Sequence, residues 1–302
     1  SSAVLGFNAE RFNISCVVLP VTIPAQIDKY RLIRHLGGGN FGQVYLAHDL
    51  ALASNTAIKL LKINNLSDVP ALIKEAQILY QCRHKHIVEI KEANVFLAGG
   101  EHFLVLGLEY LPEGSIENEM KNRWISVKES CTRIGHVLSG LEYAHAQGYL
   151  HRDIKPGNIL IAGNSSKLSD FGLASLKSLC TTGMMSYTRH CPPEHHTRQA
   201  PTALFDIYAT GITLFRIVNN YSDWREKLKN IANIDDVLRN GLILKRFGYH
   251  RFVPDKIKRI INRACNVDPL KRYQNATSFK NDLDRLRFKI DWLRTSVGNW
   301  QG

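Results

Sequence analysis

The sequence predicts an α+β protein with two lobes, a small antiparallel β-sheet lobe followed by a larger, mainly α-helical lobe. In the first third of the 302 residues, short β-compatible runs alternate with turn residues, whereas the remainder carries apolar residues at helical spacing. The two patterns meet at Leu111-Pro112-Glu113-Gly114, where proline and glycine indicate a linker. We therefore expect lobes over residues 30–111 and 112–286, an N-terminal extension over 1–29, and a basic, helical C-terminal extension over 287–302.

In the first lobe, strands are expected over residues 31–36, 43–47 and 56–61, separated by turns at 37–42 and 51–55. These runs predict an antiparallel meander. Ser67 or Asp68 then offers a helix cap, and Pro70 fits the first helical turn. A further strand is expected over 103–109, and residues 13–21 of the N-terminal extension are compatible with one added strand.

The second lobe contains two apolar patterns at helical spacing. The first predicts a buried supporting helix and consists of Ile134, Val137, Leu138, Leu141 and Ala144. The second steps by four and three and consists of Phe279, Leu283, Leu286, Ile290 and Leu293. It predicts a helix packed on the core, although a stripe that binds a partner has the same spacing.

Composition and charge narrow the class of protein. The net charge is +12, and residues 241–302 alone hold 14 Lys or Arg against five Asp and no Glu. Such a basic region attracts an acidic protein, nucleic acid or an acidic membrane surface, but a solvated helical face has the same composition. The six cysteines form no CxxC pair, which favours a reducing compartment over a disulfide scaffold or zinc site. Because neither a membrane span nor a secretory leader is visible, we expect a cytoplasmic protein.

A glycine-rich hairpin is the first element with chemical meaning. Its sequence is Gly37-Gly38-Gly39-Asn40-Phe41-Gly42, followed by Val44. Glycines in such a turn let backbone N–H groups approach phosphate oxygens. Alone the pattern is weak, since a glycine-rich turn without ligand looks the same. A dinucleotide fold is disfavoured, because its glycines join a strand directly to a helix.

A lysine and a glutamate follow at meaningful positions. Lys59 lies on the third expected strand, and alternation turns it to the same face as Ala57. Glu75 lies on the following helix, where its carboxylate can pair with Lys59 and hold the ammonium against nucleotide phosphates.

The segment 151–158 and the aspartate that follows it complete the chemistry. Asp153 can accept or orient the proton of an attacking hydroxyl, and Lys155 can neutralise charge on the transferred group. Asn158 and Asp170 supply the hard oxygen ligands that suit Mg²⁺. In this order, the residues predict a phosphotransferase that acts on a hydroxyl.

The same residues carry a resemblance to a known family. Over roughly residues 30–286 the sequence resembles the eukaryotic-type serine/threonine protein kinases, and its short lobes are similar to those of bacterial, free-standing members. The matching elements are the glycine hairpin, Ala57-Ile58-Lys59, Glu75, His151 to Asn158, Asp170-Phe171-Gly172, Pro192-Pro193-Glu194, Asp206 to Gly211 and Asp268 to Arg272.

The resemblance implies an ATP- and Mg²⁺-dependent protein kinase with the nucleotide between its lobes. Phosphates would lie under the hairpin, at Gly37, Gly39 and Gly42. The adenine would be enclosed by Val44, Ala57 and Leu160, with Leu108 at the gatekeeper position and backbone hydrogen bonds from Glu109 and Leu111. Lys155 matches the serine/threonine class rather than the tyrosine class.

The resemblance also assigns structural roles and a mode of regulation. Glu194 and Arg272 match an ion pair that anchors the activation segment, and Asp206 matches a brace of the catalytic loop. Arg152 matches kinases controlled by phosphorylation of this segment, and our hypothesis is autophosphorylation at Thr181 or Thr182. The segment departs from the family at Tyr187, where serine/threonine kinases usually have threonine, and at Pro192, the usual alanine.

Two alternative functions use the same fold. A small-molecule phosphotransferase of the aminoglycoside type would be expected to lack Arg152, Lys155 and the segment 192–194. A binding module without catalysis would have lost at least one of the four residues that the chemistry needs most, and this sequence keeps Lys59, Asp153, Asn158 and Asp170. The expected partners are therefore proteins with serine or threonine hydroxyls, and an acidic partner or nucleic acid at the basic region is a further possibility.

Overall fold

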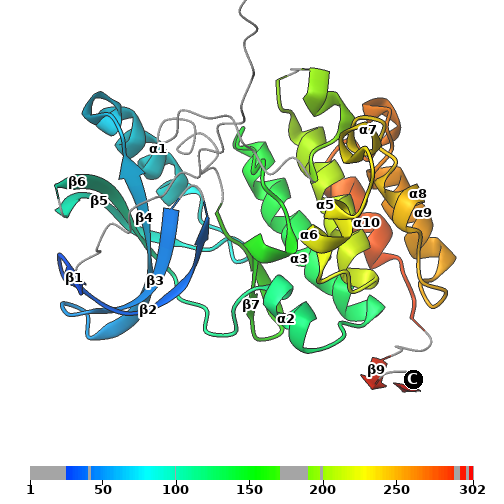
Figure 1. Ribbon diagram of the computed structural model, residues 1–302, viewed down its shortest axis with the longest axis horizontal. Helices are drawn as coiled ribbons and strands as arrows, with labels where there is room; N and C mark the ends of the chain where they lie inside the picture. Colours follow the sequence, from blue (N-terminus) through cyan, green and yellow to red (C-terminus); the bar gives the residue numbers. More distant parts are fainter. Residues whose placement is uncertain are drawn as a thin grey trace, which may run out of the picture.

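The computed structural model has two lobes, which confirms the predicted α+β architecture (Figure 1). It describes residues 25–39, 42–98, 100–170, 190–197, 200–288, 293–296 and 299–301. The candidate strand at 13–21 lies outside these residues. In the described part of the chain, no helix has both the length and the apolar character needed to cross a membrane.

The first lobe is a six-stranded antiparallel sheet in the order β1-β2-β3-β4-β6-β5, with one helix packed against β5. The strands are β1 (Gln26–Ile27), β2 (Tyr30–Gly39), β3 (Gly42–Asp49), β4 (Ser54–Ile63), β5 (Ile90–Ala98) and β6 (Glu101–Leu108). Four of them were predicted. β5 was not, because its sequence IKEANVFLA mixes charged and apolar residues, and Val95 and Leu97 are exposed.

Helix α1 (Val69–Gln81) begins where its sequence predicts, with Asp68 at the cap position and Pro70 in the first turn, but the Asp68 side chain makes no cap hydrogen bond. Leu72, Ala76 and Leu79 are buried on one face of the helix. Because this face joins the core that underlies the sheet, α1 is held in place by packing rather than by its cap.

The second lobe is built around two buried helices, α3 (Val127–Ala146) and α5 (Ala203–Val218). The predicted apolar residues of α3 are all buried, and α5 is buried on every side from Phe205 to Val218. Smaller helices cover this centre (Figure 1). They are α2 (Ile116–Asn122), α6 (Trp224–Lys229), α7 (Ile234–Arg239), α8 (Ile243–Phe247), α9 (Asp255–Ala264) and α10 (Ala276–Asp284).

Two connections join the lobes. The predicted linker 111–114 runs between β6 and α2. The other connection is a contact between the segment before β5 and a hairpin of β7 (Ile159–Ala162) and β8 (Ser165–Leu168). There the N–H of Val88 donates to Leu168 O at 3.0 Å, and the N–H of Leu168 donates to His86 O at 2.9 Å. The core is continuous across both lobes as a result.

The prediction of a helical extension over residues 287–302 is wrong. α10 ends at Asp284, and the chain instead forms β9 (Leu293–Ser296) and β10 (Asn299–Gln301), which pair antiparallel. The apolar period of α10 stops contributing buried residues after Leu283. β-Branched Thr295 and the glycine at position 298 between the strands favour a hairpin over a continued helix.

Candidate active site

Lys59 and Asp170 lie side by side, although 111 residues separate them. Lys59 sits on β4 with its side chain 5% exposed, and its Nζ is 2.6 Å from Asp170 Oδ1. Asp170 lies just beyond β8. The ammonium is therefore held at the junction of the two lobes, beside a carboxylate that a metal ion can share.

The predicted proton acceptor lies in a loop that fixes its geometry. Lys155 Nζ is 3.0 and 2.9 Å from the two carboxylate oxygens of Asp153. The Asn158 side-chain N–H donates to Asp153 O at 2.7 Å and to Asp153 Oδ2 at 3.1 Å. Because the amide nitrogen of Asn158 is used in this way, its oxygen is the atom left to act as a ligand.

His151 couples this loop to the segment that carries Asp170. Its Nδ1 accepts from the N–H of Asp153 at 3.1 Å, so its Nε2 carries the proton and donates to Ser169 O at 2.8 Å. Asn158 O accepts from the N–H of Ser169 at 2.8 Å. The separation between Asp153 and Asp170 is thus set by a hydrogen-bonded frame.

Asp206, on α5, holds the loop 151–158 in place, as the resemblance implies. Its carboxylate accepts from the N–H groups of His151 and Arg152, each at 2.8 Å, and contacts His145 Nε2 at 2.8 Å. Burial opposes ionisation of Asp206, but the bonds with His145 and His151 outweigh burial and leave its pKa below the usual range. A buried charge that satisfies two backbone N–H groups orients the loop strongly.

Two residues of this frame have left-handed backbone. Arg152 has φ 65° and Asp170 has φ 59°, a region that residues other than glycine rarely adopt. Arg152 directly precedes Asp153, and Asp170 is itself one of the acidic groups that the chemistry needs. Such strain persists only where the surroundings over-determine the conformation, here through Asp206 and the Lys59 pair.

Three of the predicted nucleotide-binding residues, Val44, Ala57 and Leu108, share one face of the sheet, as the strand register shows. Val44 pairs with Lys59 and Gly37 across the sheet, and Ala57 pairs with Leu108. Leu160 lies on β7 of the second lobe, where it forms an isolated bridge to Ser115 of the same lobe. These positions come from both lobes, as a site that clamps a planar base requires.

The glycines of the hairpin differ in the reason why a side chain would or would not fit at their positions. Gly37 and Gly42 have positive φ, and a Cβ on Gly42 would lie 2.6 Å from Leu60 O. Gly42 is therefore required by its approach to β4. A Cβ on Gly37 would meet nothing, and Gly39 pairs with Gly42 at the hairpin end. Gly37 is the position where open space leaves room for a ligand.

The backbone of the linker keeps two groups available for a base. The N–H of Glu109 already donates to Glu89 O at 3.0 Å, and Leu111 O accepts from the N–H of Gly114 at 3.2 Å. The carbonyl of Glu109 and the N–H of Leu111 remain. The Glu109 carboxylate binds Lys167 at 2.7 and 2.8 Å, which holds the linker against β8.

Some predicted residues lie outside the described set. Glu75 falls within α1, but its side chain is not among those described, so its pairing with Lys59 stays a prediction. Phe171, Gly172 and the segment through Arg189, with Thr181, Thr182 and Tyr187, also lie outside. The anchoring pair is described: Arg272 Nη1 and Nη2 lie 2.5 and 2.7 Å from the two carboxylate oxygens of Glu194.

A second support for the loop was missed by the sequence analysis. Arg216, fully buried in α5, pairs with Glu117 of α2 at 2.9 Å, and a Cβ on Gly157 would lie 2.7 Å from Glu117 Oε2. His190 Nδ1 contacts Ile154 O at 2.9 Å. Burial and the charge of Arg216 lower the pKa of His190 to about 3. The sequence signal that could have revealed this support is the single arginine, Arg216, within the apolar run of α5.

The donor set fits Mg²⁺ and a nucleotide. Asp170 and Asn158 offer oxygen ligands, and Lys59 and Lys155 offer ammonium groups for phosphate oxygens. A small apolar cavity of about 20 Å³ lies next to Asp170 and reaches Leu108. It is lined further by Leu79, Cys82, Ile87, Val88, Ile90 and Leu106.

Comparisons with known proteins agree with this geometry. A family model described as a protein kinase domain matches residues 30–282. Serine/threonine-protein kinase PrkC of Bacillus subtilis (strain 168) is 28% identical over 275 residues, which cover 88% of this chain and 41% of that protein. CBL-interacting protein kinase 26 of Oryza sativa subsp. japonica is 31% identical over 256 residues, covering 82% and 50%.

Solved structures show the same fold. The kinase domain of Mycobacterium tuberculosis PknI matches with a TM-score of 0.61 at 19% identity, over 86% of this chain and 96% of that chain. The chain spans half or less of the length of the two curated relatives above.

Proposed function

The chain belongs to the protein kinase family, and on that premise we propose that it transfers the γ-phosphoryl group of ATP to serine and threonine hydroxyls of protein substrates. The observation that carries the proposal is the convergence of Lys59, Asp153, Asn158 and Asp170 on one junction between the lobes. Kinase-family membership itself implies the use of ATP and Mg²⁺.

The reaction is a single displacement. The hydroxyl oxygen of the substrate forms a bond to the γ-phosphorus, the bond from that phosphorus to the ADP oxygen breaks, and the hydroxyl proton passes to Asp153. Lys155, 2.9 Å from Asp153, neutralises charge on the phosphoryl oxygens. Lys59 holds the non-transferred phosphates. Asn158 and Asp170 would hold Mg²⁺, which would supply positive charge to stabilise the phosphates when bound.

The finer parts of the proposal concern the acceptor and regulation. Lys155 supports serine or threonine as the acceptor, and PrkC, one of the relatives named above, is a serine/threonine-protein kinase. We propose that the chain also phosphorylates its own segment at Thr181 or Thr182. The small-molecule alternative is less well supported, because the chain has the Glu194–Arg272 anchor typical of protein kinases.

Partners and location are further proposals. The basic C-terminal region supports an acidic protein partner, with nucleic acid as the alternative. The buried thiols of Cys82 and Cys265 fit a reducing compartment such as the cytoplasm.

Transfer from γ-labelled ATP tests the proposal. We expect the intact chain to label itself or a general protein substrate in the presence of Mg²⁺, and EDTA to abolish labelling. Asp153→Ala and Lys59→Ala should each reduce incorporation by at least about a hundredfold. Lys128→Ala, an exposed position on α3, is the matched control and should label normally. Equal incorporation by all four proteins would refute the assignment.

Two further measurements separate the finer proposals. Hydrolysis of labelled protein to phosphoamino acids should give phosphoserine or phosphothreonine, and phosphotyrosine alone would contradict the class. Mass spectrometry of active protein should find phosphate at Thr181 or Thr182, and an unmodified segment in fully active protein would exclude autophosphorylation as a requirement.

A further inference from the structure

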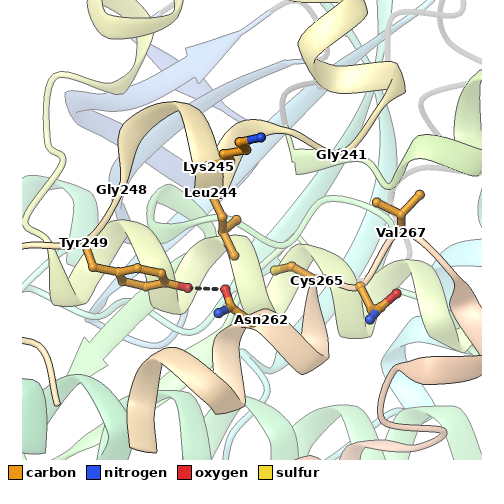
Figure 2. A pocket seen from close by; sticks show the side chains of 9 residues that line it. Gly241, Leu244, Lys245, Gly248, Tyr249, Asn262, Cys265 and Val267 are labelled. Carbon is orange, nitrogen blue, oxygen red and sulfur yellow. Dashed lines mark hydrogen bonds between the residues drawn. The ribbon is translucent and has the colours of Figure 1, made fainter. Parts of the chain in front are cut away.

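An open surface pocket formed by described residues lies away from the site between the lobes. It has a volume of about 530 Å³, within the range of ligand pockets, and opens between α8 and α9 (Figure 2). Its lining consists of Gly241, Leu244, Lys245, Gly248, Tyr249, Asn262, Cys265, Asn266 and Val267. None of these residues contributes to the reaction proposed above.

The polar groups left over in this cavity are donors. Tyr249 donates its hydroxyl proton to Asn262 Oδ1 at 2.8 Å, which leaves the Asn262 amide nitrogen (Figure 2). Asn266 Oδ1 accepts from the N–H of Asp268 at 3.0 Å, which leaves a second amide nitrogen. Lys245 adds an exposed ammonium. No described acceptor is hydrogen-bonded to these three nitrogens, so an occupant rich in acceptors, such as a carboxylate, suits them.

The charge around the cavity has the same sign. No acidic residue lines it. Six basic residues of 241–288 have no salt bridge to a described carboxylate, and four of them lie on the two helices that wall the cavity. These four are Lys245 and Arg246 on α8 and Lys256 and Arg259 on α9. Arg259 lies near Asp255 of the same helix, but the basic residues still outnumber the acidic ones on these two helices, which favours an acidic occupant.

Apolar side chains at the edge indicate a protein rather than a polyanion alone. Val267, which lines the cavity, is 50% exposed. Leu270, three residues further along the chain, is 82% exposed, and Leu242, next to Gly241, is 42% exposed. A Cβ on Gly241 would lie 2.7 Å from Val267 Cγ2, so the turns that carry Leu242 and Val267 touch. A nucleic acid backbone gains little from contact with such aliphatic groups, whereas an apolar side chain of a peptide packs against them.

We propose that the α8–α9 cavity is a docking site for an acidic segment of a partner protein. Carboxylates of the segment bind Lys245 and the amide nitrogens of Asn262 and Asn266, and one apolar side chain packs on Val267 and Leu244. The chain's own residues 1–24 do not fit this chemistry, because they contain one Glu and one Arg. The docking site goes beyond the proposed catalytic function and does not depend on it.

The walls of the cavity also reach the anchor of the activation segment. The backbone oxygens of Asn266 and Val267 accept from Arg272 Nε at 2.6 Å and Nη2 at 3.2 Å. Arg272 in turn holds Glu194 with both ends of its guanidinium. Ordering Asn266 and Val267 by a bound segment therefore orders Arg272 and, through it, the short helix η4 (Pro193–Thr197).

Nuclear magnetic resonance of the full chain tests the docking site. The probe is a ten-residue peptide of Asp and Glu with one central Leu, titrated to about 1 mM, where weak complexes are populated. We expect saturable shifts of the amide signals of Lys245, Asn262, Asn266 and Val267, and slower hydrogen exchange at Glu194. A peptide with Asn and Gln in place of the acids, and one with Ser in place of Leu, should each bind at least about tenfold more weakly.

Variants of exposed residues complete the test. Lys245→Glu and Val267→Asp should each weaken the acidic peptide at least about tenfold, because they repel its carboxylates or remove its apolar contact. Lys128→Glu, on α3, is the matched charge control and should bind normally. Melting curves identify any variant that fails to fold, and kinase assays run alongside show whether catalysis is intact.

Three outcomes would overturn the proposal. One is the absence of saturable shifts at the cavity in folded wild-type protein. Another is binding that Lys245→Glu and Lys128→Glu weaken equally. The third is equal binding of the peptides with and without Leu together with full displacement by an oligonucleotide of the same charge, which would make the surface a general polyanion site.

Discussion

Replacing Glu194 by glutamine should destabilise the second lobe by about 3 kcal/mol, the low end of the cost of breaking a buried ion pair. The change keeps the shape of Glu194, removes its charge and replaces one of its two acceptor oxygens by an amide NH2 group. Arg272 has no exposed side-chain surface, and its partner is 11% exposed. The guanidinium would then be buried without a counter-charge.

The surroundings of Arg272 show why the cost is not relieved elsewhere. Besides the two bonds to Glu194, its remaining donors reach the backbone oxygens of Asn266, Leu204 and Val267 at 2.6, 3.3 and 3.2 Å. Every N–H is therefore engaged, and the three carbonyls hold the guanidinium in place. Carbonyl dipoles do not replace a full negative charge, so the arginine stays trapped and poorly compensated.

Thermal unfolding measures the effect. For a protein of this size, 1 kcal/mol corresponds to roughly 2–4 °C, so we expect the melting temperature of Glu194→Gln to fall by roughly 6–12 °C. If the lobes melt separately, the shift belongs to the transition of the second lobe. Glu226→Gln is the matched control, because its pair with Lys229 is 66% and 63% exposed and should matter by less than about 0.5 kcal/mol.

A double-mutant cycle completes the argument. Arg272→Met combined with Glu194→Gln removes both charges, so the double variant should be less destabilised than the sum of its two single variants. Melting of Glu194→Gln within 1 °C of Glu226→Gln, or strict additivity in the cycle, would refute the reasoning.

Three other predictions concern elements that support the site. Burial, with the nearby His136 charge, lowers the pKa of His86 to about 4, so the fold keeps this imidazole neutral while the unfolded chain binds a proton below its ordinary pKa. Stability is therefore fully present above pH about 6.5 and declines towards pH about 4, by up to about 1.4 kcal/mol per pH unit. Urea unfolding at several pH values should show that the free energy of unfolding depends less on pH in His86→Gln than in the wild type, and an identical pH dependence would count against this. Glu117→Gln leaves Arg216 buried without its carboxylate and should cost about 3 kcal/mol in urea unfolding, more than the exposed control Glu226→Gln. Ser126→Ala removes the cap that accepts from the N–H of Glu129 at 3.1 Å and should lower stability by about 1 kcal/mol in the same assay, whereas no change would show that this cap is redundant.

Local signals in the sequence predicted much of the fold. The cap at Asp68 with Pro70, the apolar face of α3 and the runs that became β2, β3 and β4 each carry their information within a few residues. β5 was missed because exposed positions such as Val95 obscure its alternation, and the C-terminal hairpin was mistaken for helix because Leu293 continued the spacing of α10 by chance.

The candidate site was predictable where spacing fixes geometry. Asp153, Lys155 and Asn158 lie within six residues of one another, so their contacts follow from one loop. The contact of Lys59 with Asp170 spans 111 residues, and only the resemblance to a family placed them together. The Glu117–Arg216 pair and the donors of the α8–α9 cavity depend on helix packing, which no local pattern in the sequence encodes.

The backbone contact between His86 and Leu168 also defines how the lobes can move. With the linker after β6, it gives the described part of the lobes two backbone points of attachment, and two fixed points permit rotation about the line that joins them. Asp170 is two residues from that pivot and sweeps a short arc, while the hairpin at Gly37 is far from it and sweeps a long one. Opening of the lobes would therefore move the glycine hairpin further than Asp170.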